Sequence, residues 1–557
     1  MSGLGSSVLY RCQEAGACDF LHRPRGIRLS KVNQRLDVLA PEMLATLCRG
    51  VEKESLRIRP DGTLARTPHP TALGAALTNA YITTDFSESQ LELITGVHAS
   101  AEACAAELTE IHQFVFRHIG DEALWSCSMP GNLPADDEIP IGRYGSSNIG
   151  RLKSVYRTGL SQRYGRRMQT ISGVHYNWSL PDAAWNVLRG GGQGRQDELA
   201  FRNDAYFALI RNFRRHSWLP IFLFGASPAA CATFVAGREH RLEPLSPDTL
   251  YMPHATSLRM GKLGYQSDAQ SSLAVSYNCL DSYASSLRHA LTETYPPYES
   301  IGVRDGDNYK QLASTLLQIE NEFYGTVRPK RRVRRGERPL HALMERGVEY
   351  VEVRCMDVDP FSAIGIAPST MHFLDTFLLH CLLRESPGDH PAELAENSSN
   401  QQCAAERGRE PGLMLRRGGA SVSLRDWGMQ ILQDCAPIAE AQDRASGRRL
   451  HRDALAAAEH ALASPASTPS ARVLDEMRQR FHDSFFQFGL AQSLLHRAEL
   501  SNLALSRDAE LRWVGLAGES QQAQQRMEAE DTLPFETFRQ EYLARDMSSA
   551  PLSGPTR

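Results

Sequence analysis

Residues 50–58 read GVEKESLRI, and their alternating pattern predicts a β-strand that presents Glu52 and Glu54 on one face. Other segments of extended character carry four more groups of similar chemistry: Asp85, Glu92, His175 and Glu352. The inward face of a strand is normally apolar, so a charge there is costly unless something neutralises it. Carboxylates that converge with an imidazole suit divalent metal ions, and oxygen-rich sites favour magnesium or manganese.

Glu52 and Glu54 suit a pair of adjacent ions, because alternate residues of a strand point the same way with Cα atoms roughly 6.5 Å apart. Magnesium in such sites usually accompanies phosphates, so the first hypothesis is phosphoryl transfer from a nucleotide. Two plainer interpretations remain open: the glutamates form the solvent face of an edge strand, and His175 is a structural histidine. The glycine-rich segment GGGQG (190–194) follows no buried strand, so a nucleotide would be held through metals and arginines instead.

The composition is that of an ordinary globular protein, with 557 residues, of which 42% are hydrophobic and 23% charged. The net charge of −4 gives no global reason to expect nucleic acid or a membrane surface as a partner. No run of eighteen apolar residues and no amino-terminal hydrophobic run occurs, which argues against a membrane-spanning helix and against secretion. The eleven cysteines include no CxxC pair, so we interpret them as reduced thiols of a cytoplasmic protein.

The pattern along the chain predicts a sheet-rich body followed by helices. We expect a poorly ordered extension at 1–35, a sheet-rich catalytic region at 36–424, a helical region packed on it at 425–540, and a tail at 541–557. Residues 100–119 have helical spacing and an amino-terminal cap in Ser100. The polar stretch 386–412 is predicted to be a long exposed loop.

The basic run RPKRRVRRGER (328–338) is open to three interpretations. It could bind nucleic acid, but it is short and isolated in an acidic chain, which favours a solvated loop or a local phosphate-binding edge. Glu352 with Arg354 is similarly open. The two could form a surface charge pair, or a metal ligand beside a phosphate-binding guanidinium.

Several long segments together resemble one known family. They are GVEKESLRI, YITTDFSESQLELIT (81–95), YGSSNIGRLKSVYRTGL (144–160), RYGRRMQTISGVHYNWSLP (163–181), HATSLRMGKLGYQS (254–267), LQIENEFYGTVRPKR (317–331) and GVEYVEVRCMDVDPFS (347–362). With these motifs the chain resembles the glutamate–cysteine ligases (γ-glutamylcysteine synthetases) of the proteobacterial class, from about residue 36 to about residue 537.

The resemblance implies an α+β fold like that of glutamine synthetase, in which a curved, mostly antiparallel sheet forms a catalytic funnel with helices outside. It implies that ATP, L-glutamate and L-cysteine are substrates, with Mg²⁺ (or Mn²⁺ as a substitute) as cofactor. The reaction would form γ-glutamylcysteine, the first step of glutathione biosynthesis, through γ-glutamyl phosphate. Glutathione is the expected feedback inhibitor, and no obligate protein partner is expected.

The resemblance also assigns roles to individual residues. The family's metal-binding positions fall on Glu52, Glu54, Asp85, Glu92, His175 and Glu352. Its cysteine-binding positions fall on Phe86, Tyr156, Ile171, Arg259, Tyr265 and Tyr324. Arg157 and Arg354 fall where guanidinium groups stand near the phosphates, and we expect them to be catalytic.

Two other hypotheses are kept beside the ligase. The first is a different carboxylate–amine ligase, which the match of the cysteine-binding positions disfavours. The second is a non-catalytic nucleotide- or metal-binding regulator, which the retention of all six metal positions disfavours. Release of ADP would separate an enzyme from a regulator.

Overall fold

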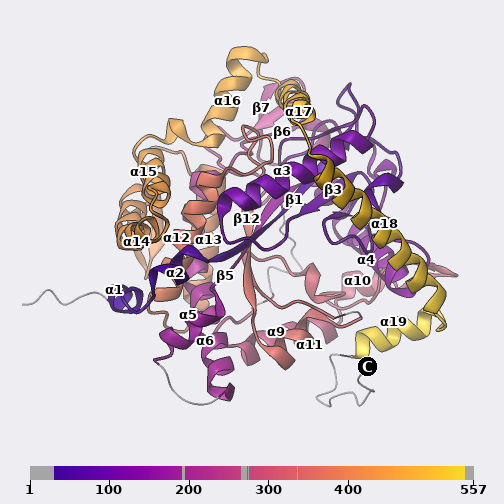
Figure 1. Cartoon of the computed structure of the whole chain (residues 1–557). Coiled ribbons are helices and arrows are strands. Elements are labelled where there is room, and N and C mark those ends of the chain that lie inside the picture. The colour runs from indigo at the N-terminus through magenta and orange to yellow at the C-terminus, as the bar shows by residue number, and fades with distance from the viewer. Residues whose placement is uncertain (1–30, 191–194, 265–272, 274, 335, 546–557) are drawn as a thin grey trace, which may run out of the picture.

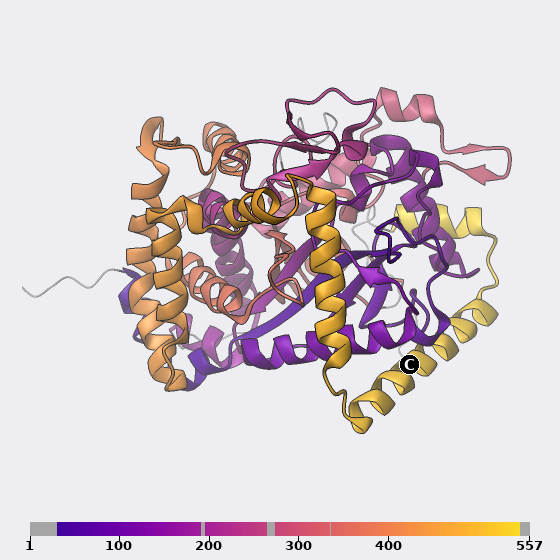
Figure 2. The ribbon, with the colours of Figure 1, turned by 90° about the horizontal axis from the view of Figure 1, so that it is seen from above.

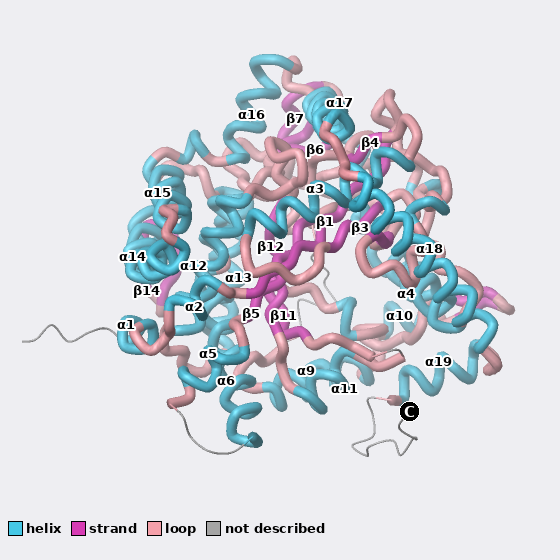
Figure 3. The backbone as a smooth tube through the Cα atoms, viewed as in Figure 1, coloured by secondary structure: helices cyan, strands magenta, loops and turns pink. Residues whose placement is uncertain are grey.

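The computed structural model describes residues 31–190, 195–264, 273, 275–334 and 336–545. An antiparallel sheet of seven strands lies at its centre, in the order β11-β12-β5-β1-β3-β2 with β4 paired to β1 (Figure 1). The strands are β1 (Cys48–Ile58), β2 (Ile82–Thr84), β3 (Gln90–Ile94), β4 (Ala123–Leu124), β5 (Gly173–Ser179), β11 (Val327–Lys330) and β12 (Tyr350–Asp357). The expected α+β fold, with helices surrounding a mostly antiparallel sheet, is confirmed (Figure 3).

The alternation within the strands divides the sheet into two chemically different faces. Val51 of β1 and Val174 and Tyr176 of β5 are fully buried in the main hydrophobic core. The residues between them, Glu52 and His175, are cross-strand neighbours on the opposite face. One face therefore holds the sheet against helices, and the other is left for polar chemistry.

Helices cover the apolar face. Helix α3 (Ala101–His118) contacts β1 and β3, α7 (Trp218–Phe224) contacts β12, and α6 (Arg195–His216) contacts β11 and β12. The cap expected for α3 is present, because the Ser100 side chain accepts a hydrogen bond from the backbone N–H of Ala103. Helix α12 (Pro368–Leu383) packs against α3 and α6, and its Asp375 reaches the sheet through Arg49 and Tyr176.

Further helices and small strands lie outside the central sheet. The helices are α1 (Lys31–Leu36), α2 (Pro41–Ala45), α4 (Asn148–Tyr164), α5 (Asp182–Leu188), α9 (Leu280–Thr292), α10 (Pro296–Ile301) and α11 (Pro339–Arg346). The small strands are β6 (Ala229–Cys231), β7 (Glu243–Ser246), β8 (Thr249–Tyr251), β9 (Arg304–Asp305), β10 (Asn308–Tyr309), β13 (Met414–Arg417) and β14 (Ala420–Ser423).

The carboxy-terminal part is helical, as predicted. It contains α14 (Leu424–Ser446), α15 (Leu450–Ala463), α16 (Pro469–Arg480), α17 (Phe485–Asn502), α18 (Arg507–Glu530) and α19 (Phe535–Ala544). Helices α14 and α15 pack on each other and on α12, whereas α17 and α18 both contact α3 (Figure 2). The sequence-based division into regions at residues 424 and 540 stays a prediction.

The long exposed loop predicted at 386–412 is wrong. Most of that stretch forms α13 (Pro391–Arg407), which packs against α7 and contacts β13. Its buried residues are Asn400, Ala404 and Ala405, which carry too little hydrophobic signal to mark a helix face. The Asn400 side chain instead exchanges two hydrogen bonds with the backbone of Arg416, at 2.7 and 2.8 Å, and this long-range tie is invisible in a local pattern.

None of the helices within the described residues is long and apolar enough to cross a membrane.

Candidate active site

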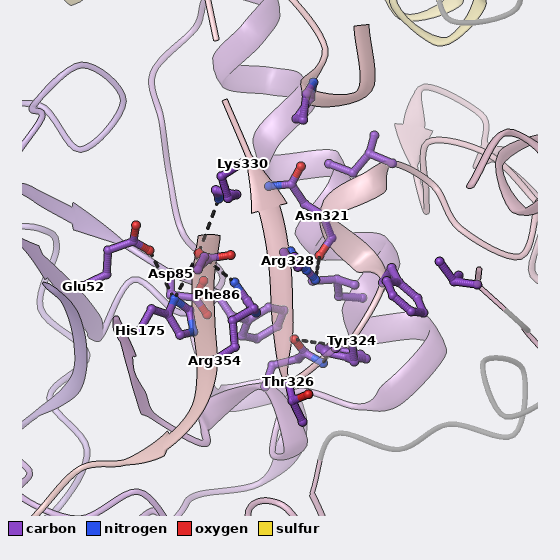
Figure 4. A pocket seen from close by; sticks show the side chains of 18 of the residues that line it. Glu52, Asp85, Phe86, His175, Asn321, Tyr324, Thr326, Arg328, Lys330 and Arg354 are labelled. Carbon is purple, nitrogen blue, oxygen red and sulfur yellow. Dashed lines mark hydrogen bonds and ion pairs between the residues drawn. The ribbon is translucent and has the colours of Figure 1, made fainter. Parts of the chain in front are cut away.

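The polar face of the sheet forms the floor of a cavity of about 1190 Å³. Its walls come from α4, α13 and the segment between residues 319 and 330. Figure 4 shows side chains from separate strands converging there. Of the fourteen candidate residues, twelve line the cavity: Glu52, Glu54, Asp85, Phe86, Glu92, Tyr156, Arg157, His175, Arg259, Tyr324, Glu352 and Arg354. The roles assigned to them remain proposals.

The two other candidates differ. Ile171 does not line the cavity. It is fully buried, and its carbonyl accepts a hydrogen bond from the Gln90 side chain at 3.2 Å. Tyr265 lies outside the described residues.

One end of the cavity gathers carboxylates. Glu54 of β1 is the direct cross-strand partner of Glu92 of β3, and Asp85 follows β2 where the chain turns toward β3. Burial, then the charge of nearby Asp85, raise the pKa of Glu54 to about 8. Burial, then the charges of Glu52, Asp85 and Glu54, raise the pKa of Glu92 well above its usual range. Acids crowded in this way need a positive charge if all of them are to ionise.

His175 stands at the centre of the acidic set. Its Nδ1 lies 3.2 Å from an oxygen of Glu52 and 3.6 Å from Glu352, and its Nε2 lies 3.7 Å from Glu54. Burial, reinforced by the charge of Arg354, lowers the pKa of His175, which favours the neutral imidazole that can ligate a metal. These contacts favour a role for His175 in the site over the purely structural role that the sequence left open.

Three cations line the cavity beside Glu352. Lys330 Nζ and Arg354 Nη1 lie 3.4 and 3.1 Å from the same oxygen of Glu352. Although burial opposes ionisation, these two cations hold the pKa of Glu352 well below its usual range. Arg328, also in the cavity, is the cross-strand partner of Glu352 on β11. Three cations thus face a single fully buried carboxylate.

A β-bulge helps to place Arg354. The register between β12 and β5 shifts by one residue between Val353 and Met356, and Arg354 lies within that irregularity. The carbonyl of Arg354 accepts a hydrogen bond from Arg259 Nη2 at 2.8 Å. The bulge therefore brings two guanidinium groups to the same edge of the cavity.

The basic run at 328–338 divides between two roles. Arg328 and Lys330 line the cavity, whereas Arg338 pairs with Glu320 at 2.8 Å and Arg331 lies 3.6 Å from Glu349. This geometry favours the phosphate-binding edge over a continuous nucleic-acid patch. Sequence reasoning did not single out Lys330 as a site residue, although its alternation with Arg328 in VRPK was a usable signal.

Lys153 also lines the cavity, but the sequence did not indicate it as a site residue. It lies on α4 beside the acidic end, and its ammonium group is 5.1 Å from the centre of the Tyr144 ring. Burial, then the neighbouring Arg157, lower its pKa to about 8. The helical segment that contains it has no local feature pointing to a site.

A group of uncharged and aromatic side chains lines one part of the cavity wall. It comprises Phe86, Tyr156 and Tyr324, and the Tyr324 hydroxyl lies 3.1 Å from the Gln169 amide nitrogen. Burial raises the pKa of Tyr156 and Tyr324, so both hydroxyls stay protonated. These groups can enclose a small side chain while offering hydroxyls for hydrogen bonds.

The acidic set fits a divalent cation. Glu52, His175 and Glu352 each offer a ligand atom, and these atoms lie within 4.8 Å of one another. The second oxygen of Glu352 is buried without a hydrogen-bond partner among the described residues. A metal ion would satisfy a buried carboxylate oxygen that has no hydrogen-bond partner.

Comparison with known proteins decides the family. A family model described as glutamate-cysteine ligase matches residues 34–404. The chain belongs to the glutamate–cysteine ligase family. Among the relatives in this family, the glutamate–cysteine ligase of Pseudomonas entomophila is 48% identical over 510 residues, 91% of this chain and 96% of the relative. That of Alcanivorax borkumensis is 47% identical over 520 residues, 92% of this chain and 98% of the relative.

A solved structure agrees with the family. The crystal structure of the Francisella tularensis glutamate–cysteine ligase in complex with AMP matches with a TM-score of 0.84 and 34% identity, over 90% of this chain and 98% of that chain. A bifunctional glutathione synthetase from Pasteurella multocida matches with a TM-score of 0.68 and 24% identity, over 87% of this chain and 58% of that chain. The second likeness supports the fold alone.

Proposed function

We propose that the chain joins the γ-carboxylate of L-glutamate to the amine of L-cysteine at the expense of ATP, giving γ-glutamylcysteine for glutathione biosynthesis. The observation that carries the proposal is the cavity in which crowded acids lie beside three cations, in a chain of this family. The AMP bound to the Francisella relative supports a nucleotide substrate. Nine cysteines in the described part of the chain are free thiols, as a reducing cytoplasm would leave them.

The chemistry requires two anions to meet. In the first step an oxygen of the glutamate γ-carboxylate attacks the γ-phosphorus of ATP, ADP leaves, and γ-glutamyl phosphate forms. Arg328, Lys330 and Arg354, which line the cavity, would neutralise the phosphate oxygens, and Arg157 would supply a fourth cation from α4. In the second step the cysteine amine attacks the γ-carbonyl carbon, phosphate leaves, and the amine nitrogen loses a proton to become the amide.

Magnesium, with manganese as a substitute, is the cofactor that the acidic set would hold. The proposed ligands are Glu52, Glu54, Asp85, Glu92, His175 and Glu352. Bound there, the ion would neutralise phosphate charge during transfer. The protein's own part is to hold these ligands in register: Glu52 is fixed by Asn177 at 2.9 Å, and Glu54 accepts the backbone N–H of Gly173 at 2.7 Å.

Cysteine would occupy the wall formed by Phe86, Tyr156 and Tyr324, with Arg259 nearby. Such a wall excludes larger side chains sterically. It discriminates weakly against an isosteric side chain, since one methylene in a pocket is worth about 1–3 kcal/mol. We therefore expect 2-aminobutyrate to replace cysteine with reduced efficiency.

The test is ADP release by the purified protein with ATP, magnesium, glutamate and cysteine, with each component omitted in turn. We expect release to require all four and to fall away in Glu52→Ala, and we expect the product to have the mass of γ-glutamylcysteine. Equal release with any amine acceptor would point to a different carboxylate–amine ligase. No release under any combination would make the chain a binding protein.

Glutathione is the proposed feedback inhibitor, because it contains the γ-glutamylcysteine unit and could occupy both amino-acid positions. Initial rates measured at several glutathione concentrations should show competition with glutamate. Inhibition that does not change with glutamate concentration would contradict this assignment.

A further inference from the structure

A second cluster of metal-ligating side chains lies on the far side of the sheet from the cavity. His372 and Asp375 belong to α12 and His451 to α15, two helices that pack together at the left of Figure 1. One ligand atom from each residue lies within 4.8 Å of the other two. Their exposed fractions are 6%, 0% and 9%, so the cluster is shielded from water.

His372 is a buried imidazole with one unpartnered ring nitrogen. Its Nε2 pairs with a carboxylate oxygen of Glu102 at 3.4 Å. Its Nδ1 has no hydrogen-bond partner in the part of the chain that the structure describes. Leaving a polar atom without a hydrogen bond in the interior is costly, and a neutral imidazole in this state has a lone pair ready for a cation.

His451 is already oriented as metal-bound histidines are. Its Nδ1 lies 3.1 Å from Asp443 Oδ1, and its backbone N–H donates to the same oxygen at 2.9 Å. A carboxylate that holds one ring nitrogen fixes the tautomer and frees the other nitrogen as a ligand. The rings of His451 and His372 meet with their centroids 4.9 Å apart.

We propose that His372, Asp375 and His451 bind a divalent transition-metal ion of the zinc class, in a structural site that joins α12 to α15. A tetrahedral zinc ion with bonds of about 2.0–2.2 Å holds its ligand atoms roughly 3.4 Å apart, so binding would draw the three groups inward by about 1 Å. The site stands apart from the magnesium ligands and from the ligase reaction.

The charges around the cluster favour zinc over magnesium. Each nearby carboxylate already has an arginine: Arg49 lies 3.0 Å from Asp375, Arg448 lies 3.0 Å from Glu102, and Arg452 lies 2.9 Å from Asp443. Little net negative charge is left to attract a hard cation. Two imidazoles therefore set the affinity, and imidazole prefers zinc and its neighbours to magnesium.

The ion would connect the catalytic sheet with the helical carboxy-terminal part. Asp375 accepts a hydrogen bond from Tyr176 of β5 at 2.7 Å and pairs with Arg49 of β1. These strands carry His175 and Glu52 on their other face. Zinc at the cluster should accordingly raise the thermal midpoint in a concentration-dependent manner.

The first experiment measures retained metal. The full-length protein is stripped with a chelator, loaded with zinc chloride in the presence of excess magnesium, dialysed and analysed by elemental mass spectrometry. We expect one retained equivalent in the unmodified protein and in His289→Asn, an exposed control, and none in the His372→Asn, His451→Asn double variant. The proposal is overturned if the unmodified protein retains no zinc, or if the double variant retains as much.

A second measurement avoids dependence on the folding of the double variant. Cobalt chloride is added to the stripped, unmodified protein and to Glu52→Gln, which alters the cavity ligands only. Both proteins should develop the same visible absorption of tetrahedral cobalt and the same rise in thermal midpoint with zinc. A signal that disappears in Glu52→Gln would assign the ion to the cavity and refute the second site.

Discussion

Glu352 shows at the scale of a single residue how the cavity manages its charges. It is fully buried, and burial alone would raise its pKa. Lys330 and Arg354 nevertheless hold the pKa well below the usual range. Burial, and then the charges of neighbouring acids, raise the pKa values of Glu54 and Glu92. The same side-chain type thus takes opposite protonation states in one cavity, according to its neighbours.

Arg354→Lys keeps the charge beside Glu352 but loses the planar fork that suits phosphate oxygens. We expect kcat to fall by about 10²–10³-fold, as when a preorganised donor to a developing charge is removed. Steady-state kinetics with saturating glutamate and cysteine measure this. Arg332→Lys, at an exposed position that lies 3.6 Å from Glu349, is the control and should leave kcat unchanged. A kcat within a factor of three of the unmodified value would show that Arg354 is not a phosphate ligand.

The buried Lys53 should make the stability of the folded protein depend on pH. It lies on the apolar face of β1, where no carboxylate among the described residues pairs with it, and burial lowers its pKa to about 7. Because its pKa is lower in the folded state, the charged form penalises folding fully below pH 7, and the penalty fades as the pH rises toward 10.5. Lys53→Met should therefore remove a penalty of roughly 3–5 kcal/mol on the free energy of unfolding at pH 6 and almost no penalty near pH 10.

The measurement for Lys53→Met is urea unfolding at both pH values, with Lys310→Met as an exposed control. Loss of the 3.2 Å contact with His112 Nε2 costs about 1–3 kcal/mol at either pH, so the change between the two pH values is the readout. If Lys53→Met changes the free energy of unfolding by the same amount at pH 6 and pH 10, then Lys53 does not carry a pH-dependent penalty.

At the scale of the elements, strands carry six of the twelve candidate residues that line the cavity. The pattern of residues 50–58 correctly predicted that Glu52 and Glu54 share one face, because a strand has a strict period of two. Local pattern failed where stability comes from distant partners. Helix α13 was missed for that reason, and the bulge that positions Arg354 has no signature in VEVRCMD.

The missing side chain of Gly173 in β5 leaves room for the Arg259 guanidinium. A Cβ at this position would lie 2.1 Å from Arg259 Nη2, so Gly173→Ala must displace the guanidinium from the Arg354 carbonyl. We expect the KM for cysteine to rise by about tenfold or more, with a smaller change in the KM for ATP. Gly515→Ala, in α18 with open space around it, is the matched control. An unchanged KM for cysteine would remove Arg259 from the cysteine-binding group.

At the scale of the whole molecule, the antiparallel sheet brings together residues up to three hundred positions apart. Glu52, His175 and Glu352 come from β1, β5 and β12, which are neighbours in the sheet although long insertions separate them along the chain. Family resemblance could foresee that assembly, whereas composition and periodicity could not. The physical reason is that strand order is fixed by long-range pairing, about which a local pattern carries no information.

The central claim is that this cavity forms γ-glutamyl phosphate, and oxygen transfer tests it most directly. Glutamate labelled with ¹⁸O in its γ-carboxylate is turned over with ATP, magnesium and cysteine, and the released phosphate is analysed by mass spectrometry. The mechanism predicts one ¹⁸O atom in each phosphate, because the carboxylate oxygen that attacks phosphorus leaves with it. Unlabelled phosphate formed alongside γ-glutamylcysteine would contradict the mechanism.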